Sequence, residues 1–394
     1  MNDQQQRIIK SHVGLGRPPF ECVALVLQGG GALGAYQGGV YQALAEADIV
    51  PDWVAGISIG AINAALIAGN PPDKRIERLR EFWEGVTAPN GLDFIDTMEN
   101  FWRGDVARSF FNQLKATGAI VQGAPGFFEP RVPPPYFRPA GTIEATSYYD
   151  TSELRGTLER LVDFDYLNSN ADKMRLSVGS VNVRSGNFVY FDTKNRTIRP
   201  EHVMASGALP PGFPAVEVEG ELYWDGGLIS NTPLQWVTTG AEERHDTIAF
   251  QVDLWSSRGD APGDLADVIT RQKEIQYSSR TRYNTDTFKH LQTVRRTLAE
   301  ALDKVPAEWL DNEEGRLLKS FADRKVYSVV HLIYRSKNYE KTSKDYEFSA
   351  LSMRDHWQAG YNDTVRSLRH PEALQRPTDR SGVATFDLGV GGRD

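Results

Sequence analysis

The sequence predicts an α/β fold built on a mainly parallel sheet. Residues 22–28 and 246–255 are nearly continuous apolar runs, which are typical of strands buried on both faces. A further observation is the order of elements within the first 70 residues, where strand, helix, strand and helix follow one another. Because parallel strands need crossover connections of this kind, the order favours a parallel sheet.

The other expected elements follow from local patterns along the chain. Before residue 260, helices are expected over 37–49, 61–68, 71–118 and 151–164, a strand over 50–58, and two strands within 175–192 joined by a turn at 184–187. After it, amphipathic helices are expected over 265–282, 290–304 and 349–368, with one strand over 325–335. The polar tail over 376–394 is expected to be loose.

This change of texture suggests a division of the chain into an N-terminal arm over 1–20, a main domain over 21–259 and a mostly helical C-terminal extension over 260–394. Homodimerisation through the long helices of the extension is a hypothesis.

Composition excludes several classes of protein. The 394 residues include 44 basic and 52 acidic side chains, and no long basic block is present, which argues against nucleic acid as a partner. The single cysteine, Cys22, excludes an intrachain disulfide and a cysteine-based zinc site. The longest apolar stretch, 57–69, is too short to span a bilayer, and the first residues have no apolar leader pattern. We expect a cytoplasmic protein, with peripheral contact to a membrane left open.

Ser58 stands between Gly56 and Gly60, where the second strand meets the alanine-rich helix. Gly-x-Ser-x-Gly at such a junction is the pattern of a nucleophile elbow, a tight turn that presents the serine at the C-terminal edge of the sheet. Larger side chains at the two glycines would collide with the adjoining strand and helix, and the helix N-terminus favours negative charge near the serine oxygen. We therefore predict Ser58 as the nucleophile of an acyl-enzyme. A glycine-rich turn that serves packing alone is the alternative.

The base that would activate Ser58 is predicted to be a carboxylate. None of the seven histidines lies in an obvious glycine-flanked loop after a strand, and His331 lies in an apolar strand pattern that favours a core position. Asp225 ends a short apolar stretch and is followed by Gly226 and Gly227, which allow a tight bend. Such an aspartate can take the serine proton directly. An Asp-Gly turn between two strands is the alternative.

The glycine-rich loop at 29–34 allows three interpretations. It fits the dinucleotide fingerprint, but that function needs an acidic residue about 20 positions on, and the second strand ends without one. A second interpretation is an oxyanion hole, in which backbone N–H groups of Gly29–Gly31 lie beside Ser58. The third is a tight turn required for packing.

Together these motifs resemble the patatin-like phospholipase family of lipid acyl hydrolases. The residues that carry the resemblance are the glycine loop at 29–34, Gly-Ile-Ser-Ile-Gly at 56–60, Ala-Ser-Gly-Ala-Leu-Pro at 205–210, Asp-Gly-Gly at 225–227 and Asn-Thr-Pro at 231–233. The motifs occur in the order and spacing of the family and span about residues 22–235. The part over 260–394 is similar to an extension carried by a bacterial subset of the family.

The resemblance implies a three-layer α/β/α fold and a Ser–Asp dyad that works without histidine, metal or cofactor. Ser58 would attack an acyl ester of a lipid or phospholipid, and Asp225 would take its proton and later activate the deacylating water. The implied oxyanion-hole residues are Gly29, Gly30, Gly31 and Ile59. The glycines with an implied structural role are Gly34, Gly56, Gly60, Gly226 and Gly227.

One residue departs from the family pattern, in which the glycine loop often carries Arg or Lys at the position of Leu33. The loss of that charge puts a preference for anionic head groups in doubt more than ester hydrolysis itself. Two other functions stay open: an acyltransferase that uses the same acyl-enzyme, and a non-catalytic lipid-binding protein.

The segment over 119–141 is rich in proline, glycine and aromatic residues. A long irregular segment of this kind is often functional, and its aromatic residues suit an apolar substrate. We predict that it forms a lid or mouth, with an ordinary surface loop as the alternative.

Overall fold

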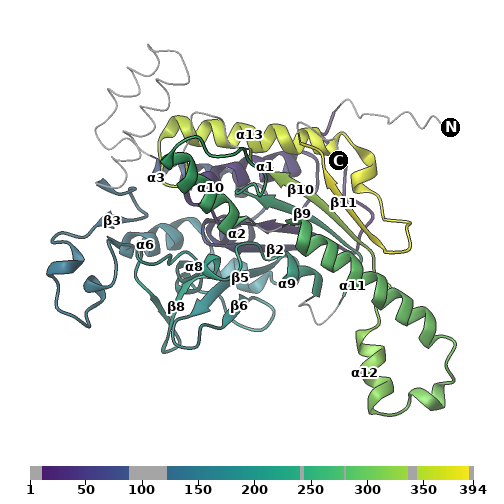
Figure 1. Ribbon diagram of the computed structural model, residues 1–394. Helices are drawn as coiled ribbons and strands as arrows, with labels where there is room; N and C mark the ends of the chain where they lie inside the picture. The colour runs from purple at the N-terminus through teal and green to yellow at the C-terminus, as the bar shows by residue number, and fades with distance from the viewer. Residues whose placement is uncertain (1–10, 88–121, 240–243, 279–280, 336–343, 390–394) are drawn as a thin grey trace.

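The structure is a computed structural model that describes residues 11–87, 122–239, 244–278, 281–335 and 344–389. Its centre is a nine-stranded sheet (Figure 1). The strands are β1 (Cys22–Leu27), β2 (Trp53–Ile57), β5 (Arg175–Asn182), β6 (Phe188–Asp192), β7 (Val216–Val218), β8 (Glu221–Asp225), β9 (Thr247–Asp253), β10 (Tyr327–Ile333) and β11 (Val383–Asp387). Two short strands, β3 (Glu129–Pro130) and β4 (Tyr149–Asp150), form a separate pair.

The helices of the main domain follow the strands in sequence. They are α1 (Ala35–Glu46), α2 (Ile59–Ala68), α3 (Arg75–Val86), α6 (Ser152–Leu161), α7 (Phe164–Ser169), α8 (Pro200–Ser206) and α9 (Leu234–Thr239). The later helices are α10 (Leu265–Tyr277), α11 (Thr281–Leu302), α12 (Glu313–Phe321) and α13 (Ala350–Leu368). Short 3₁₀ turns cover Gly31–Gly34, Pro135–Phe137, Ile143–Ala145, Gly226–Leu228, Ala307–Leu310 and Pro371–Leu374.

The sheet is mostly parallel, as predicted. Its order is β11-β10-β9-β1-β2-β5-β8-β7, and every pairing from β11 to β5 along this order is parallel. The antiparallel pairings are confined to the other end, where β6 and β8 pair with β5 and β7 pairs with β8. Carboxyl ends of neighbouring parallel strands meet at one edge, so the loops after β1 and β2 lie side by side there.

Helices cover both faces of the sheet, which explains the continuous apolar pattern of its central strands. Val23 and Leu25 of β1 belong to the large core that also contains residues of α1, α2 and α13. Ala24 and Val26 point to the opposite face, where they pack with Leu234 of α9. The three-layer α/β/α arrangement expected from the sequence is confirmed.

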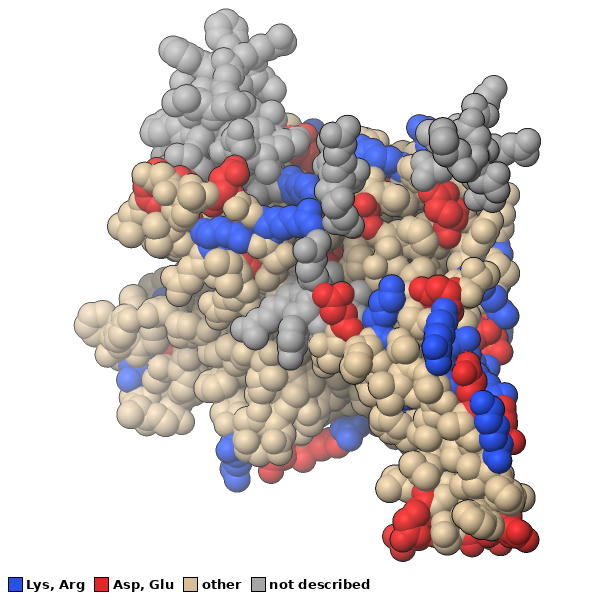
Figure 2. All heavy atoms as spheres, turned by 45° about the vertical axis from the view of Figure 1, so that its right-hand side comes forward, with Lys and Arg blue, Asp and Glu red and all other residues tan. Residues whose placement is uncertain are grey.

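The part after residue 260 is tied into the same sheet. β10 pairs with β9 in parallel, and α13 packs along α1 (Figure 1). α11 and α12 project from the body, and Figure 2 shows acidic side chains at the end of this protrusion and mixed basic and acidic ones along it.

The prediction that the tail over 376–394 is loose was wrong for residues 383–387, and residues 390–394 lie outside the described part of the chain. Residues Val383–Asp387 form β11, which pairs with β10 at the edge of the sheet. Val383 is fully buried and packs with Phe288 and Tyr327. The strand looks polar in the sequence because an edge strand exposes alternate side chains. Its pairing partner, β10, lies about fifty residues earlier in the chain, so no local pattern indicates the pairing.

Other elements differ as well. The helices α7, α8, α9 and α12 were not predicted, and α11 begins at Thr281, whereas the helix was expected over 290–304. The helix expected over 71–118 is seen as α3, Arg75–Val86, and residues 88–118 lie outside the described part of the chain. Residues 119–121 of the predicted lid lie outside it as well.

Candidate active site

The elbow at Ser58 lies between β2 and α2. Ser58 has φ 57° and ψ −127°, a left-handed conformation that costs a non-glycine residue free energy and is common at active sites. A Cβ on Gly56 would lie 2.2 Å from the carbonyl oxygen of Gly60, and one on Gly60 would lie 2.4 Å from that of Leu27. Both positions therefore require glycine, and the turn is held tightly against β1.

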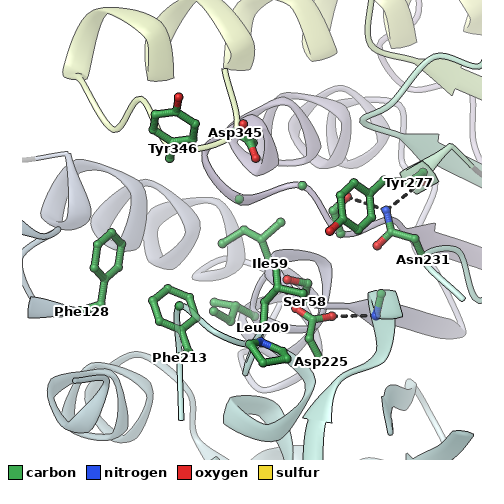
Figure 3. Close-up of a pocket in the computed structure, with 18 of the residues that line it drawn as sticks. Ser58, Ile59, Phe128, Leu209, Phe213, Asp225, Asn231, Tyr277, Asp345 and Tyr346 are labelled. Atoms are coloured by element: carbon green, nitrogen blue, oxygen red, sulfur yellow. Dashed lines mark hydrogen bonds between the residues drawn. The ribbon is translucent and has the colours of Figure 1, made fainter. Parts of the chain in front are cut away.

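Asp225 ends β8, and its side chain lies next to that of Ser58 (Figure 3). It is 1% exposed, and burial raises its pKa to about 7. A hydrogen bond from Ser58 and one from the Gly227 N–H, at 2.7 Å, oppose this rise because they stabilise the carboxylate. A carboxyl group with a pKa near neutrality is suited to accept and return a proton.

Ser206 fixes the backbone of the elbow. Its Oγ accepts a hydrogen bond from the Ser58 N–H at 3.1 Å and donates one to the Gly179 carbonyl at 2.6 Å. Ser206 is fully buried at the end of α8. In the sequence this serine is visible only as part of the Ala-Ser-Gly-Ala-Leu-Pro motif at 205–210, and no local pattern indicates its role.

The glycine loop after β1 runs beside Ser58. A Cβ on Gly29 would lie 2.9 Å from the Ser58 Cβ, so the two segments are in contact. The N–H of Gly29 donates to the Asn231 carbonyl at 3.3 Å, whereas the described part of the chain provides no acceptor for the N–H of Gly30 or Gly31. This geometry favours Gly30 and Gly31 over Gly29 as oxyanion donors.

The remaining oxyanion candidate, Ile59, is the first residue of α2. Its N–H therefore belongs to the helix N-terminus, where backbone donors lack intrahelical acceptors.

A segment far along the chain holds the glycine loop from outside. The Asp345 carbonyl accepts the Ala32 N–H at 2.9 Å, and a Cβ on Gly31 would lie 2.1 Å from the same oxygen. Gly31 also has a positive φ of 56°. No local signal in the sequence points to Asp345, because its contact with the loop spans more than 300 residues.

Asn231 links the loop to α10. Its Nδ2 donates to the carbonyl of Gly29 and to the carbonyl of Tyr277, each at 3.0 Å. Trp255 Nε1 donates to the Gly29 carbonyl at 3.0 Å, and Gln28 Nε2 donates to the Tyr277 carbonyl at 3.1 Å. Asn231 belongs to the Asn-Thr-Pro motif of the sequence analysis, which gave it no role.

Ser58 and Asp225 line a cavity of about 320 Å³. One side is aromatic: Phe127, Phe128, Phe213 and Phe348 line it and contact one another, with ring centroids of Phe128 and Phe213 5.3 Å apart. Figure 3 shows Phe128 and Phe213 on one side of Ser58, and Tyr277 and Asn231 on the other.

The predicted lid contributes two residues to this cavity, Phe127 and Phe128, which are both buried. Farther along the same segment Val132, Tyr136 and Phe137 are strongly exposed. Part of the segment therefore forms the cavity wall, while movement of the segment as a lid stays a prediction.

The other motif glycines lie where neighbouring groups leave no room for a side chain. A Cβ on Gly34 would lie 2.5 Å from Ile59, and one on Gly226 would lie 2.6 Å from the Gly179 carbonyl. A Cβ on Gly227 would lie 3.0 Å from Asn231 Oδ1. These glycines support the site through close packing.

No histidine lies among the described residues that line the cavity. His331 is buried in β10, as expected, and burial lowers its pKa to about 4. Within the described ranges, acidic residues, cysteines and histidines form no group of three that could hold a metal ion. None of the described helices is both long and apolar enough to cross a membrane.

Comparison with known proteins identifies the family. The family model described as "Patatin-like phospholipase" matches residues 25–236, more than half of the chain, and a second model described as "Patatin phospholipase" matches residues 275–380. The chain therefore belongs to the patatin-like phospholipase family.

Two relatives from Caenorhabditis elegans match short segments. The putative patatin-like phospholipase domain-containing protein M110.7 is 36% identical over 73 residues, which is 18% of this chain and 7% of the relative. The patatin-like phospholipase domain-containing protein ZK370.4 is 34% identical over 97 residues, which is 25% of this chain and 6% of the relative. The matches thus span a small fraction of either relative. Among solved structures, VipD from Legionella pneumophila aligns over 88% of this chain and 67% of its own, with 15% identity and a TM-score of 0.36.

Proposed function

We propose that the protein is a serine acyl hydrolase that cleaves lipid acyl esters through Ser58 and Asp225. The observation that carries the proposal is the contact between a serine in a strained elbow and a buried carboxyl group whose pKa is about 7. Membership of the patatin-like phospholipase family supports the choice of lipid esters.

Ser58, Asp225 and water account for every bond and proton transfer of the proposed reaction. Ser58 Oγ forms a bond to the ester carbonyl carbon, and its proton passes to Asp225. The tetrahedral intermediate then breaks its bond to the alcohol oxygen, which leaves with that proton. Water attacks the acyl-enzyme, gives a proton to Asp225 and releases the acid, and Ser58 regains its proton.

The developing negative charge on the carbonyl oxygen requires donors that are already in place. The N–H groups of Gly30 and Gly31 are the best candidates, with Ile59 at the start of α2. Asp345 positions this loop through its bond to Ala32 and does not touch the reacting atoms in the proposal.

The shape of the cavity suggests how the ester is oriented. The wall formed by Phe127, Phe128, Phe213 and Phe348 suits an acyl chain, since burial of apolar surface favours binding. The alcohol part would then lie toward Tyr277 and Asp345, where the lining is more polar.

Acyl transfer to an alcohol uses the same acyl-enzyme, so product analysis must separate the two activities. The protein is incubated with p-nitrophenyl octanoate, with and without butanol, and nitrophenol, octanoic acid and butyl octanoate are measured. The proposal expects equal amounts of nitrophenol and octanoic acid in both conditions. Butyl octanoate as the main product would indicate an acyltransferase. A folded protein that releases no nitrophenol would favour the non-catalytic lipid-binding function.

A further inference from the structure

The polar end of the cavity contains a single cation among the described residues that line it, Lys273 of α10. Its Nζ lies 3.0 Å from Oδ1 and 2.8 Å from Oδ2 of Asp345, and it also lies over the ring of Tyr346 at 5.1 Å from the centroid. The side chains of the pair are 30% and 22% exposed. Lys273, the one ammonium group among these described lining residues, is therefore already paired with a carboxylate.

Cations near this pair are matched in the same way. Lys344 Nζ lies 2.7 Å from Glu274 Oε1, and Arg271 Nη1 lies 2.9 Å from Glu274 Oε2. Lys273 and Glu274 of α10 thus pair with Asp345 and Lys344, two consecutive residues of the segment that precedes α13, with opposite signs at each step. This double ion pair joins α10 to the segment that holds the glycine loop.

The described lining of the cavity carries no net positive charge. Its charged members are Lys273, Asp345 and Asp225, which is one cation against two carboxyl groups. A phosphate group would have to displace Asp345 from Lys273 or lie near the carboxyl group of Asp225, and either event costs free energy. An uncharged hydroxyl or ester oxygen can form a hydrogen bond with Lys273 or Asp345 while the two side chains stay paired with each other.

We propose that the Lys273–Asp345 pair makes the site selective for acyl esters of uncharged alcohols, of the glyceride type, over esters that carry a phosphate. The proposal rests on the proposed function of Ser58 and Asp225. It assigns the pair a role in substrate choice, because the chemical step requires neither side chain.

The test compares two substrates that differ only in the phosphate: dioctanoylglycerol and dioctanoyl phosphatidic acid, each at the same fraction in micelles of a neutral detergent. The measured quantity is the ratio of kcat/KM for the two lipids, so that general losses of activity cancel. The protein forms compared are the wild type, Asp345→Asn and Lys273→Met. Asp303→Asn is the matched control, because Asp303 is an exposed ion-paired carboxylate in the chain between α11 and α12.

The wild type is expected to prefer dioctanoylglycerol by about tenfold or more, the effect of one incompletely screened charge. Asp345→Asn frees Lys273 while keeping the backbone carbonyl that bonds to Ala32, so the ratio should fall toward one. Lys273→Met leaves Asp345 unpaired, so the ratio should rise. Asp303→Asn should leave the ratio at the wild-type value.

A wild type that hydrolyses phosphatidic acid as fast as dioctanoylglycerol would overturn the proposal. So would an unchanged ratio in both cavity variants, or an equal change in Asp303→Asn. Hydrolysis of p-nitrophenyl butyrate is measured beside each lipid. If the wild type fails with all three esters, the proposed function itself is wrong, whereas failure of the charge proposal leaves hydrolysis of the nitrophenyl ester in place.

Discussion

Replacing Asn231 by alanine tests whether the glycine loop must be held from α10. The substitution removes two hydrogen bonds from Nδ2, to the carbonyls of Gly29 and Tyr277. Each carbonyl keeps a second donor, Trp255 for Gly29 and Gln28 for Tyr277, so neither becomes an unpaired buried group. At about 1 kcal/mol for each lost hydrogen bond, we expect the interactions that hold the glycine loop to weaken by about 2 kcal/mol in total.

If this weakening acts mainly by displacing the oxyanion donors, the transition state loses about 2 kcal/mol of stabilisation and kcat should decrease by about 30-fold. The assay is the hydrolysis of p-nitrophenyl butyrate, measured together with the free energy of unfolding in urea. Asn168→Ala is the matched control, because Asn168 Nδ2 also donates to two carbonyls, those of Phe164 at 2.7 Å and Ile198 at 2.9 Å, away from the cavity.

The control should lose at least as much unfolding free energy as Asn231→Ala, since its Oδ1 also accepts the Ile198 N–H, and it should keep its kcat. The reasoning would be refuted if Asn231→Ala lost stability with an unchanged kcat. It would also be refuted if both variants lost activity in proportion to their stability, since the effect would then be general.

Three further predictions concern the base, the loop and the surface. Burial raises the pKa of Asp225 to about 7, and the reaction needs the ionised form of this residue. We therefore expect kcat/KM to rise with pH up to about 7 and then level off. A flat profile over a scan from about pH 5 to about pH 8 would contradict this role. Gly31→Ala places a side chain at a positive φ and against a backbone oxygen, so the variant should lose both stability and activity. Gly186 also has a positive φ, of 68°, but a Cβ there would meet open space. Gly186→Ala should therefore lower the free energy of unfolding by about 1 kcal/mol and keep activity. Val268 and Ile269 of α10 are 47% and 45% exposed. If this surface contacts lipid, replacing both residues by serine should weaken binding to phosphatidylcholine vesicles by about tenfold. Equal vesicle binding of the wild type and this double variant in a flotation assay would exclude such a contact.

The parts of the fold that the sequence predicted are those with local signals. The apolar runs of β1 and β9 and the glycine pattern around Ser58 are readable because burial on two faces and a tight turn each restrict neighbouring residues. The edge strand β11 lacked such a signal, since it is polar on its exposed side and depends on β10 for its pairing.

The candidate site divides in the same way. Ser58 and Asp225 can be recognised in the sequence because each lies within two residues of glycines whose positions leave no room for a side chain. Lys273, Asp345 and Tyr277 do not stand out, because they are ordinary residues that reach the cavity through contacts across the chain. Their position at the cavity depends on the packing of α10 against the glycine loop and the segment that contains Asp345.

The most direct test of the central claim is intact-mass analysis after treatment with a fluorophosphonate, which forms a stable bond with an activated serine. The wild type should gain one adduct, Ser58→Ala should gain none, and Asp225→Asn should react far more slowly. An adduct that persists on Ser58→Ala, or labelling of Asp225→Asn at the wild-type rate, would contradict a nucleophile at Ser58 that is activated by Asp225.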